Sequence, residues 1–268
     1  MPEITLPDGE PLYYETHGSG EPLLLVTGLN GLASFWKPHV EVLARRFTLI
    51  LHDHRGTGAS SLKSLAFSVE QMMADVLALM DALGIRSADI LGHSTGGAIG
   101  QVLAVERPER VRRLLISASW PGRDPYFDLL FETRAAVLRT FGPSEYVRQT
   151  VLIGMPPTWL RDHPEKADPP ASDLVRILVR SSECTLGRIE AIRAFDRRAD
   201  LGRIACPVLV AGTEDDMVTP AHLSRELAAT IPRARLDMAD WGGHFYPLIR
   251  PEFFRDQVLS FFTEKVSA

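Results

Sequence analysis

The sequence predicts an α/β protein in which a mostly parallel, twisted sheet is flanked by helices and interrupted by a helical insertion. Short continuous apolar runs, typical of strands buried on both faces, alternate with apolar residues at helical spacing. This alternation stops after residue 119 and resumes near residue 205. We therefore expect a core domain of residues 1–119 and 205–268, and a helical cap, or lid, of residues 120–204.

The first part of the chain contains the beginning of the sheet. Residues 4–15 place a Pro-Asp-Gly turn signal before an apolar and aromatic run, which predicts an antiparallel hairpin at the sheet edge. Buried strands are expected at residues 22–27 and 47–51. A helical pattern over residues 34–45 separates them.

The next helix has clear signals at both ends. Ser68 followed by Gln71 predicts a capping box, and Gly84 ends the helical pattern. A strand that ends at Gly92 and a buried strand over residues 113–117 follow.

The predicted cap contains several helical patterns and no evident buried strand. Its turns are expected at three proline-containing positions: Gly142-Pro143, Met155-Pro156-Pro157 and Asp168-Pro169-Pro170. After the cap, a strand is expected at residues 207–211, followed by a helix with Thr219 at the N-cap and Pro220 at the first helical position. A last strand at residues 234–238 precedes a final helix that begins at Pro251.

The motif Gly92-x-Ser94-x-Gly96 lies between a predicted strand and a predicted helix. In this G-x-S-x-G pattern, called a nucleophile elbow, the serine occupies a strained turn and the glycines let strand and helix pass closely. Glycine is common enough that the bare pattern would occur by chance in about one such sequence in ten. The remaining chain must therefore supply partners for Ser94.

A serine nucleophile needs an adjacent base, and the base needs a carboxylate that orients it. Open parallel sheets place such groups where their strands end. Two strand ends after the cap offer them, residues 212–220 with two aspartates and residues 242–244 with His244.

With these motifs, the chain resembles the α/β-hydrolase family from about Leu12 to Phe262. The order serine, aspartate, histidine along the chain is the order of that family. The resemblance implies that Ser94 is the nucleophile and His244 the general base and acid. It also rests on a D-x-R-G-x-G-x-S loop at Asp53, Arg55, Gly56, Gly58 and Ser60.

Two adjacent aspartates compete for the third position. Counting from the glycine of the G-x-x-D pattern selects Asp215. Counting from Pro207 along the strand, or back from Thr219-Pro220, selects Asp216, which we therefore prefer.

The resemblance also implies an oxyanion hole made by two backbone N–H groups, those of Leu29 and Thr95. The chain departs from the family at the first of these loops, where the usual His-Gly is Thr27-Gly28. The Asn30 side chain is a candidate for an additional contact with the substrate. Trp120 and Trp159 are the predicted substrate-binding residues of the cap.

We expect neither a metal nor a cofactor. His52 and His54 share one face at strand spacing, but with no third ligand in view their packing in the loop is the preferred interpretation. Arginine far outnumbers lysine in the cap, which suggests a carboxylate-bearing substrate. Because acids balance these arginines, solvated ion pairs explain them better.

The substrate is expected to be a small ester, lactone or amide/carbamate-type compound, cleaved through an acyl-enzyme. This rests on similarity to the aminoacrylate (carbamate) hydrolases of pyrimidine utilisation and to 3-oxoadipate enol-lactonases. A C–C bond hydrolase of aromatic catabolism and a non-catalytic ligand-binding homologue are the alternatives.

The composition argues against nucleic acid and membranes as binding partners. The net charge is −5 and the pI is near 5.9, so no basic field would attract nucleic acid or an anionic membrane. No apolar signal-peptide core or membrane-spanning run is present, and the two cysteines cannot form a disulfide framework. We expect a cytoplasmic enzyme with a small-molecule substrate, and the resemblance is compatible with a homodimer.

Overall fold

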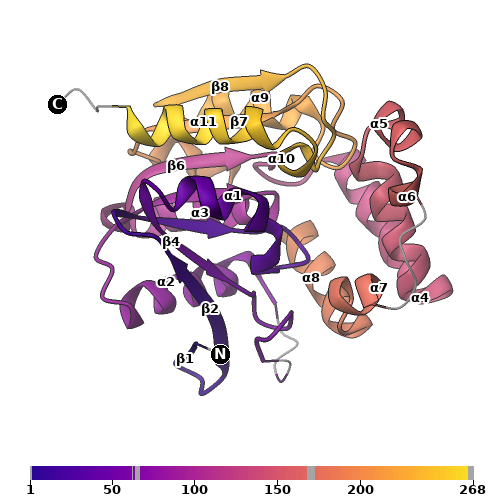
Figure 1. The fold of residues 1–268 in the computed structure, drawn as a ribbon, viewed down its shortest axis with the longest axis horizontal. Coiled ribbons are helices and arrows are strands. Elements are labelled where there is room, and N and C mark those ends of the chain that lie inside the picture. The colour runs from indigo at the N-terminus through magenta and orange to yellow at the C-terminus, as the bar shows by residue number, and fades with distance from the viewer. Residues whose placement is uncertain (1, 62, 64–66, 168–172, 265–268) are drawn as a thin grey trace.

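The structure is a computed structural model that describes residues 2–61, 63, 67–167 and 173–264. Its described strands form one eight-stranded sheet in the order β1-β2-β4-β3-β5-β6-β7-β8 (Figure 1). The first pairings, β1 with β2 and β2 with β4, are antiparallel, and all others are parallel. The strands are β1 (Glu3–Thr5), β2 (Pro11–His17), β3 (Glu21–Val26), β4 (Phe47–His52), β5 (Ala88–His93), β6 (Val111–Ser117), β7 (Val208–Thr213) and β8 (Ala234–Ala239). The predicted α/β class and the edge hairpin are confirmed.

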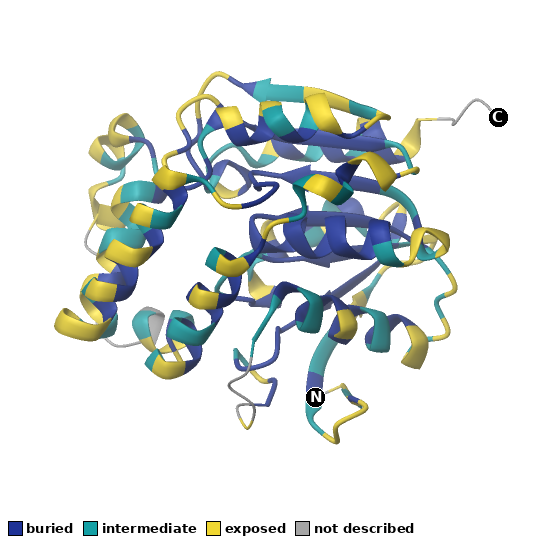
Figure 2. Ribbon diagram, turned by 180° about the vertical axis from the view of Figure 1, so that it is seen from behind, coloured by how far each residue is buried: buried dark blue, intermediate teal, exposed yellow. Residues whose placement is uncertain are grey.

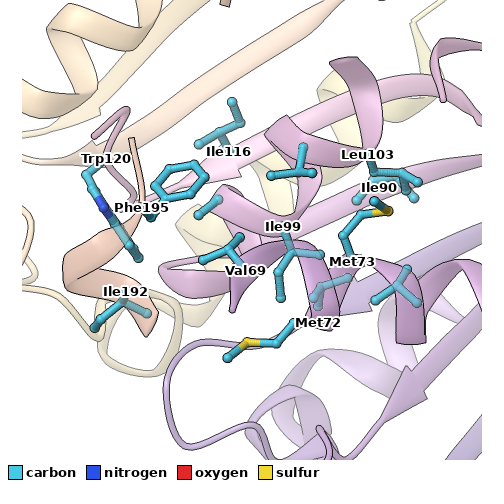
Figure 3. Packing of buried hydrophobic residues seen from close by; sticks show 14 of the residues in the cluster. Val69, Met72, Met73, Ile90, Ile99, Leu103, Ile116, Trp120, Ile192 and Phe195 are labelled. Carbon is cyan, nitrogen blue, oxygen red and sulfur yellow. The ribbon is translucent and has the colours of Figure 1, made fainter. Parts of the chain in front are cut away.

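Both faces of the sheet are covered, which explains the continuous apolar runs. In β3, Leu24 and Val26 pack into the cluster formed with α2 (Val69–Ala82), α3 (Thr95–Glu106) and α9 (Ala221–Thr230). The alternate residues of β3 pack on the other face, against α1 (Lys37–Leu43) and α11 (Pro251–Thr263). Two further elements, η1 (Ala33–Trp36) and α10 (Tyr246–Ile249), precede α1 and α11. Figure 2 shows the buried sheet between these outer helices, and Figure 3 shows methionines of α2 packed beside Ile99 of α3.

The start and end of α2 follow the predicted signals, with one difference. The Ser68 hydroxyl accepts a hydrogen bond from the Gln71 N–H at 3.0 Å, and Gly84 ends the helix with φ +66°. The Gln71 side chain, however, donates to Asp75 instead of returning to Ser68. Only half of the expected capping box therefore forms, because a buried carboxylate on the next turn competes for the amide.

All the regular elements described between β6 and β7 are helices. They are α4 (Pro125–Gly154), α5 (Pro157–Asp162), α6 (Pro164–Ala167), α7 (Asp173–Leu178), α8 (Ser182–Ala194) and η3 (Arg198–Arg203). One more short helix, η2 (Pro108–Arg110), lies before β6. Helices α4 to α8 lie beside the sheet, beyond the ends of strands such as β6 and β8 (Figure 1). We call residues 120–204 the cap.

Two of the three turns predicted in the cap are present. Gly142 has φ +82° and breaks α4 just before Pro143. Residues 155–157 separate α4 from α5. The third predicted turn, Asp168-Pro169-Pro170, lies outside the described residues. Within the part of the chain that the structure describes, no helix has the length and apolar character needed to cross a membrane.

Candidate active site

Ser94 lies at the turn between β5 and α3, with φ +55° and ψ −119°. A non-glycine residue at positive φ is strained and persists only where the surroundings hold it. Here the Ser94 N–H donates to the Ser117 carbonyl at 2.8 Å. A Cβ on Gly96 would collide with the Val26 carbonyl, and one on Gly92 with the start of α3. The glycines of the motif are therefore required by close backbone packing around the serine.

His244 and Asp216 meet in a buried hydrogen-bonded pair. The distance between His244 Nδ1 and Asp216 Oδ2 is 2.9 Å, and the two residues are 4% and 5% exposed. The carboxylate also accepts from the N–H groups of Val218 and Thr219 at 2.7 and 2.9 Å, and from the Thr219 hydroxyl at 2.9 Å. Because an ionised carboxylate only accepts hydrogen bonds, His244 Nδ1 carries the proton, which leaves Nε2 as an acceptor.

The two adjacent aspartates have different partners. Asp215 accepts hydrogen bonds from the N–H groups of Gly242 and Gly243 at 3.2 and 2.8 Å, so it holds the loop before the histidine. Asp216 contacts the imidazole itself. The sequence left a choice between these two aspartates. In the structure the one that contacts His244 is Asp216, the preferred one.

Thr219 was expected to cap α9, and this expectation is wrong. The helix begins at Ala221 with Pro220 at the N-cap, and no side chain caps it. The Thr219 hydroxyl donates to Asp216 instead, because the turn that follows β7 directs it toward the carboxylate. Its oxygen also lies 3.3 Å from His244 Nδ1.

Ser94 and His244 line one cavity of about 210 Å³ that lies between the core and the cap. Leu29 and Asn30 contribute to its wall from the loop after β3. A Cβ on Gly28 would lie 3.0 Å from Ser94 Cβ, so this loop passes directly beside the serine. Thr95 is the first residue of α3, a position whose N–H has no partner within the helix.

Trp120 and Trp159, the cap residues predicted to bind substrate, do not line this cavity. Trp120 is 1% exposed and stacks on Phe127 with ring centroids 4.7 Å apart. Figure 3 shows it among Ile192 and Phe195 in the hydrophobic core. Trp159 stacks on His163 at 4.2 Å. The structure thus gives neither residue a place in the cavity wall, because a large aromatic residue in a helical pattern packs equally well in a core or in a pocket wall.

The cap wall of the cavity consists of Phe131, Arg134, Thr150 and Leu178. Sequence reasoning singled out none of them. Phe131 and Arg134 lie one turn apart on α4, and the chain reverses at Gly142 to bring Thr150 beside them. The only signal available was the excess of arginine in the cap.

Arg134 is buried without an acidic partner among the described residues. It is 4% exposed, donates from Nη2 to the Thr150 hydroxyl at 2.9 Å, and within the described ranges its Nε has no hydrogen-bond partner. Its guanidinium carbon lies 5.4 Å from the ring centre of Phe131 and 4.6 Å from that of Tyr146. A buried cation with spare donors in a cavity wall can bind an anionic group.

His52 and His54 stack on each other with ring centroids 4.9 Å apart. Burial lowers the pKa of His52 to about 4. In the described ranges, no three His, Cys, Asp or Glu side chains form a group that could hold a metal ion.

Comparisons with known proteins agree with this architecture. The family model of the alpha/beta hydrolase fold matches residues 21–251. A protein of Azorhizobium caulinodans named "Putative carbamate hydrolase RutD" is 39% identical over 250 residues, which cover 93% of this chain and 94% of that protein. A protein of the same name from Caulobacter sp. strain K31 is 38% identical over 93% of this chain and 95% of its own. Among solved structures, the enol-lactonase of Burkholderia xenovorans LB400 has a TM-score of 0.87 at 28% identity, with 98% of this chain and 100% of that chain covered.

Proposed function

Because this chain belongs to the α/β hydrolase family and is a hydrolase, we propose that it cleaves a small ester, lactone, amide or carbamate through an acyl-enzyme. Ser94 is the nucleophile, His244 the general base and acid, and Asp216 the residue that orients the histidine. The observation that carries this proposal is the buried Asp216–His244 hydrogen bond at the wall of the cavity that Ser94 also lines.

The reaction follows from these groups. Ser94 Oγ attacks the carbonyl carbon while His244 Nε2 accepts the hydroxyl proton. The tetrahedral oxyanion accepts hydrogen bonds from the N–H groups of Leu29 and Thr95. His244 then gives its proton to the leaving oxygen or nitrogen, and the acyl group remains on the serine. A water molecule, deprotonated by His244, attacks the acyl-enzyme, and the released serine oxygen takes back the proton.

Two further observations support a small acyl compound as the substrate. The cavity of about 210 Å³ is smaller than the usual pocket for a drug-sized ligand. The relatives are named as carbamate hydrolases, and a structural neighbour is an enol-lactonase, so the names describe chemistry on acyl groups.

Arg134 supports an anionic group on this substrate. Its guanidinium lines the same cavity as Ser94, and among the described residues no carboxylate neutralises it. An isolated buried charge is costly, and a substrate carboxylate placed against Arg134 and Thr150 would compensate it. We therefore propose a carboxylate-bearing acyl compound as the substrate class.

Labelling with a fluorophosphonate probe tests the serine mechanism. We expect one adduct per chain on Ser94 in the parent and none in S94A, because only an activated serine attacks the phosphorus. The position is read by peptide mass spectrometry. A parent protein that stays unlabelled and has no activity on p-nitrophenyl acetate, like S94A, would support a ligand-binding protein instead.

The same ester assay distinguishes the two aspartates. D216A is expected to lower kcat by about 10³–10⁴-fold, since the imidazole loses the group that sets its tautomer. D215A keeps the Asp216–His244 bond and loses only the contacts to the glycine loop, so a smaller loss is expected. A larger loss in D215A than in D216A would refute this assignment.

A further inference from the structure

Arg188 of α8 is one of the largest fully buried side chains in the molecule, at 1% exposure. Its three guanidinium nitrogens contact three different residues of the core. Nε donates to the Leu29 carbonyl at 2.8 Å, Nη1 to the Arg55 carbonyl at 3.2 Å, and Nη2 to His54 Nδ1 at 2.7 Å. The described residues include no carboxylate paired with Arg188, and burial lowers its pKa to about 10. Three of its N–H groups thus donate to two main-chain carbonyls and a neutral imidazole.

The contact to Leu29 lies in the middle of the loop that passes beside Ser94. The loop is a turn closed by a hydrogen bond from the Gly31 N–H to the Gly28 carbonyl at 3.0 Å. Its far end is held by the core, because the His54 N–H and the Thr57 hydroxyl both donate to the Gly31 carbonyl. The central carbonyl, that of Leu29, is held by the cap through Arg188.

Fixing this carbonyl restricts the adjoining peptide units, one of which carries the Leu29 N–H. Oxyanion donors act only when they are aimed in advance at the position of the developing charge, and misplacement by a fraction of an ångström is costly. Arginine suits this role because its planar guanidinium donates to both loops at once, to Leu29 in one and to His54 and Arg55 in the other. The ammonium group of a lysine is too compact to do so. Arg188 itself has no place in the wall of the catalytic cavity.

We propose that Arg188 is a positioning residue that ties the oxyanion loop to helix α8, so that the Leu29 N–H is aimed correctly only when the cap is seated on the core. This inference rests on the proposed function, because it assigns a role to the oxyanion hole. It makes the cap a part of the catalytic machinery in addition to a wall of the pocket.

The test compares R188M and R188K with the parent on p-nitrophenyl acetate. We expect R188M to lower kcat by about 10–100-fold with KM changed less than about threefold, since the loop acts on the transition state. Inhibition by trifluoroacetone, which forms a hemiketal oxyanion on the serine, should weaken by a similar factor. The kcat of R188K should lie between those of the parent and R188M, about threefold or more below that of the parent. Thermal unfolding midpoints verify that the variants are folded, and R188K decides the question if R188M does not fold.

R180M is the matched control. Arg180 also reaches from the cap to core carbonyls, those of Gly58 and Ser60, the latter at 2.9 Å, but it does not contact the oxyanion loop. We expect its kcat and its ketone inhibition to stay within about threefold of the parent. An unchanged kcat and ketone affinity in the folded Arg188 variants, or an equal loss in R180M, would overturn the proposal. If the parent still forms the Ser94 adduct, that result refutes only the role of Arg188. A parent that forms no adduct refutes the proposed function, and the role of Arg188 with it.

Discussion

The arginines of the cap differ from one another in what surrounds their guanidinium groups. Arg123 pairs with Asp128 and Arg198 with Glu226 in partly exposed ion pairs, as the balance of charges in the sequence suggested. Such surface pairs contribute little to stability. Arg134 and Arg188 are buried, and among the described residues neither has a carboxylate partner. Their cost must be offset by other contacts, and for Arg134 we propose that a substrate carboxylate supplies them.

Replacing Arg134 is expected to change the choice of substrate. In R134M, kcat/KM for mono-p-nitrophenyl succinate should fall by about 10–100-fold, because a hydrogen-bonded contact to a charged group is worth about 1.5–3 kcal/mol. The activity on p-nitrophenyl butyrate, in which a methyl group replaces the carboxylate, should change less than about threefold. R139M, on the exposed side of the same helix near Glu190, is the control. Equal losses on both esters would contradict a carboxylate site at Arg134.

Among the structural elements, the loop after β4 explains why its motif has the form D-x-R-G-x-G-x-S. Asp53 accepts from the N–H groups of Ala33 and Ala59, both at 2.8 Å, and a Cβ on Gly58 would collide with this carboxylate. Ser60 donates to the Asp53 carbonyl at 2.6 Å and accepts from the Tyr13 N–H of β2. The motif therefore shapes a loop, and the same loop supplies the His54 and Arg55 contacts of Arg188.

Arg55 connects this loop to α2 through a bidentate pair with Asp75, at 2.7 and 3.1 Å, and it also contacts Asp8. R55M should lower the free energy of unfolding by about 3–5 kcal/mol, because it leaves the buried Asp75 carboxylate without its partner. In R55M/D75L most of this loss should be recovered, since a buried ion pair is roughly equivalent to apolar residues of similar volume. Urea denaturation of the single and double variants measures both effects. A double variant less stable than R55M would argue against this account.

At the scale of the whole molecule, the fold buries several histidines in their neutral form. Desolvation is the main cause that lowers their pKa values, to about 4 for His39 and for His52. Two others, His54 and His93, are shifted in the same direction. An unfolded histidine has a pKa near 6.5, so between about pH 6.5 and 4 the unfolded chain binds more protons. The free energy of unfolding therefore falls as the pH decreases through this window.

His39 allows this prediction to be tested with one residue. It is fully buried and packs against Phe254 with ring centroids 5.0 Å apart. The charge of Arg255 also contributes to its lowered pKa. In H39L the slope of stability against pH between 6.5 and 4 should be smaller than in the parent by up to one proton, about 1.4 kcal/mol per pH unit. Denaturant titrations at several pH values provide the slopes, and identical slopes would show that His39 titrates normally.

Local patterns predicted the sheet and the strand-turn-helix around Ser94, and the structure contains both. They succeeded because burial on both faces, positive φ and close backbone approach each demand particular residues near one another in the chain. The predictions for Thr219 as a helix cap and Trp120 as a pocket residue failed because their local signals are ambiguous. The local signal for a helix cap or an aromatic pocket residue also fits a hydroxyl that serves a carboxylate or a ring buried in the core. The family assignment drawn from the motifs is confirmed by the match over residues 21–251.

The sequence by itself determined the α/β class and the elbow at Ser94, because these depend on short-range sterics and on periodic burial. It also located His244, which lines the same cavity, from its place after the last strand. Only the tertiary structure decided that Asp216 and not Asp215 contacts His244, that Arg134 faces the cavity, and that Arg188 reaches Leu29 across 159 positions of the chain. The physical reason is that the direction of a side chain and the compensation of its charge depend on how distant segments pack, and no local pattern encodes that packing.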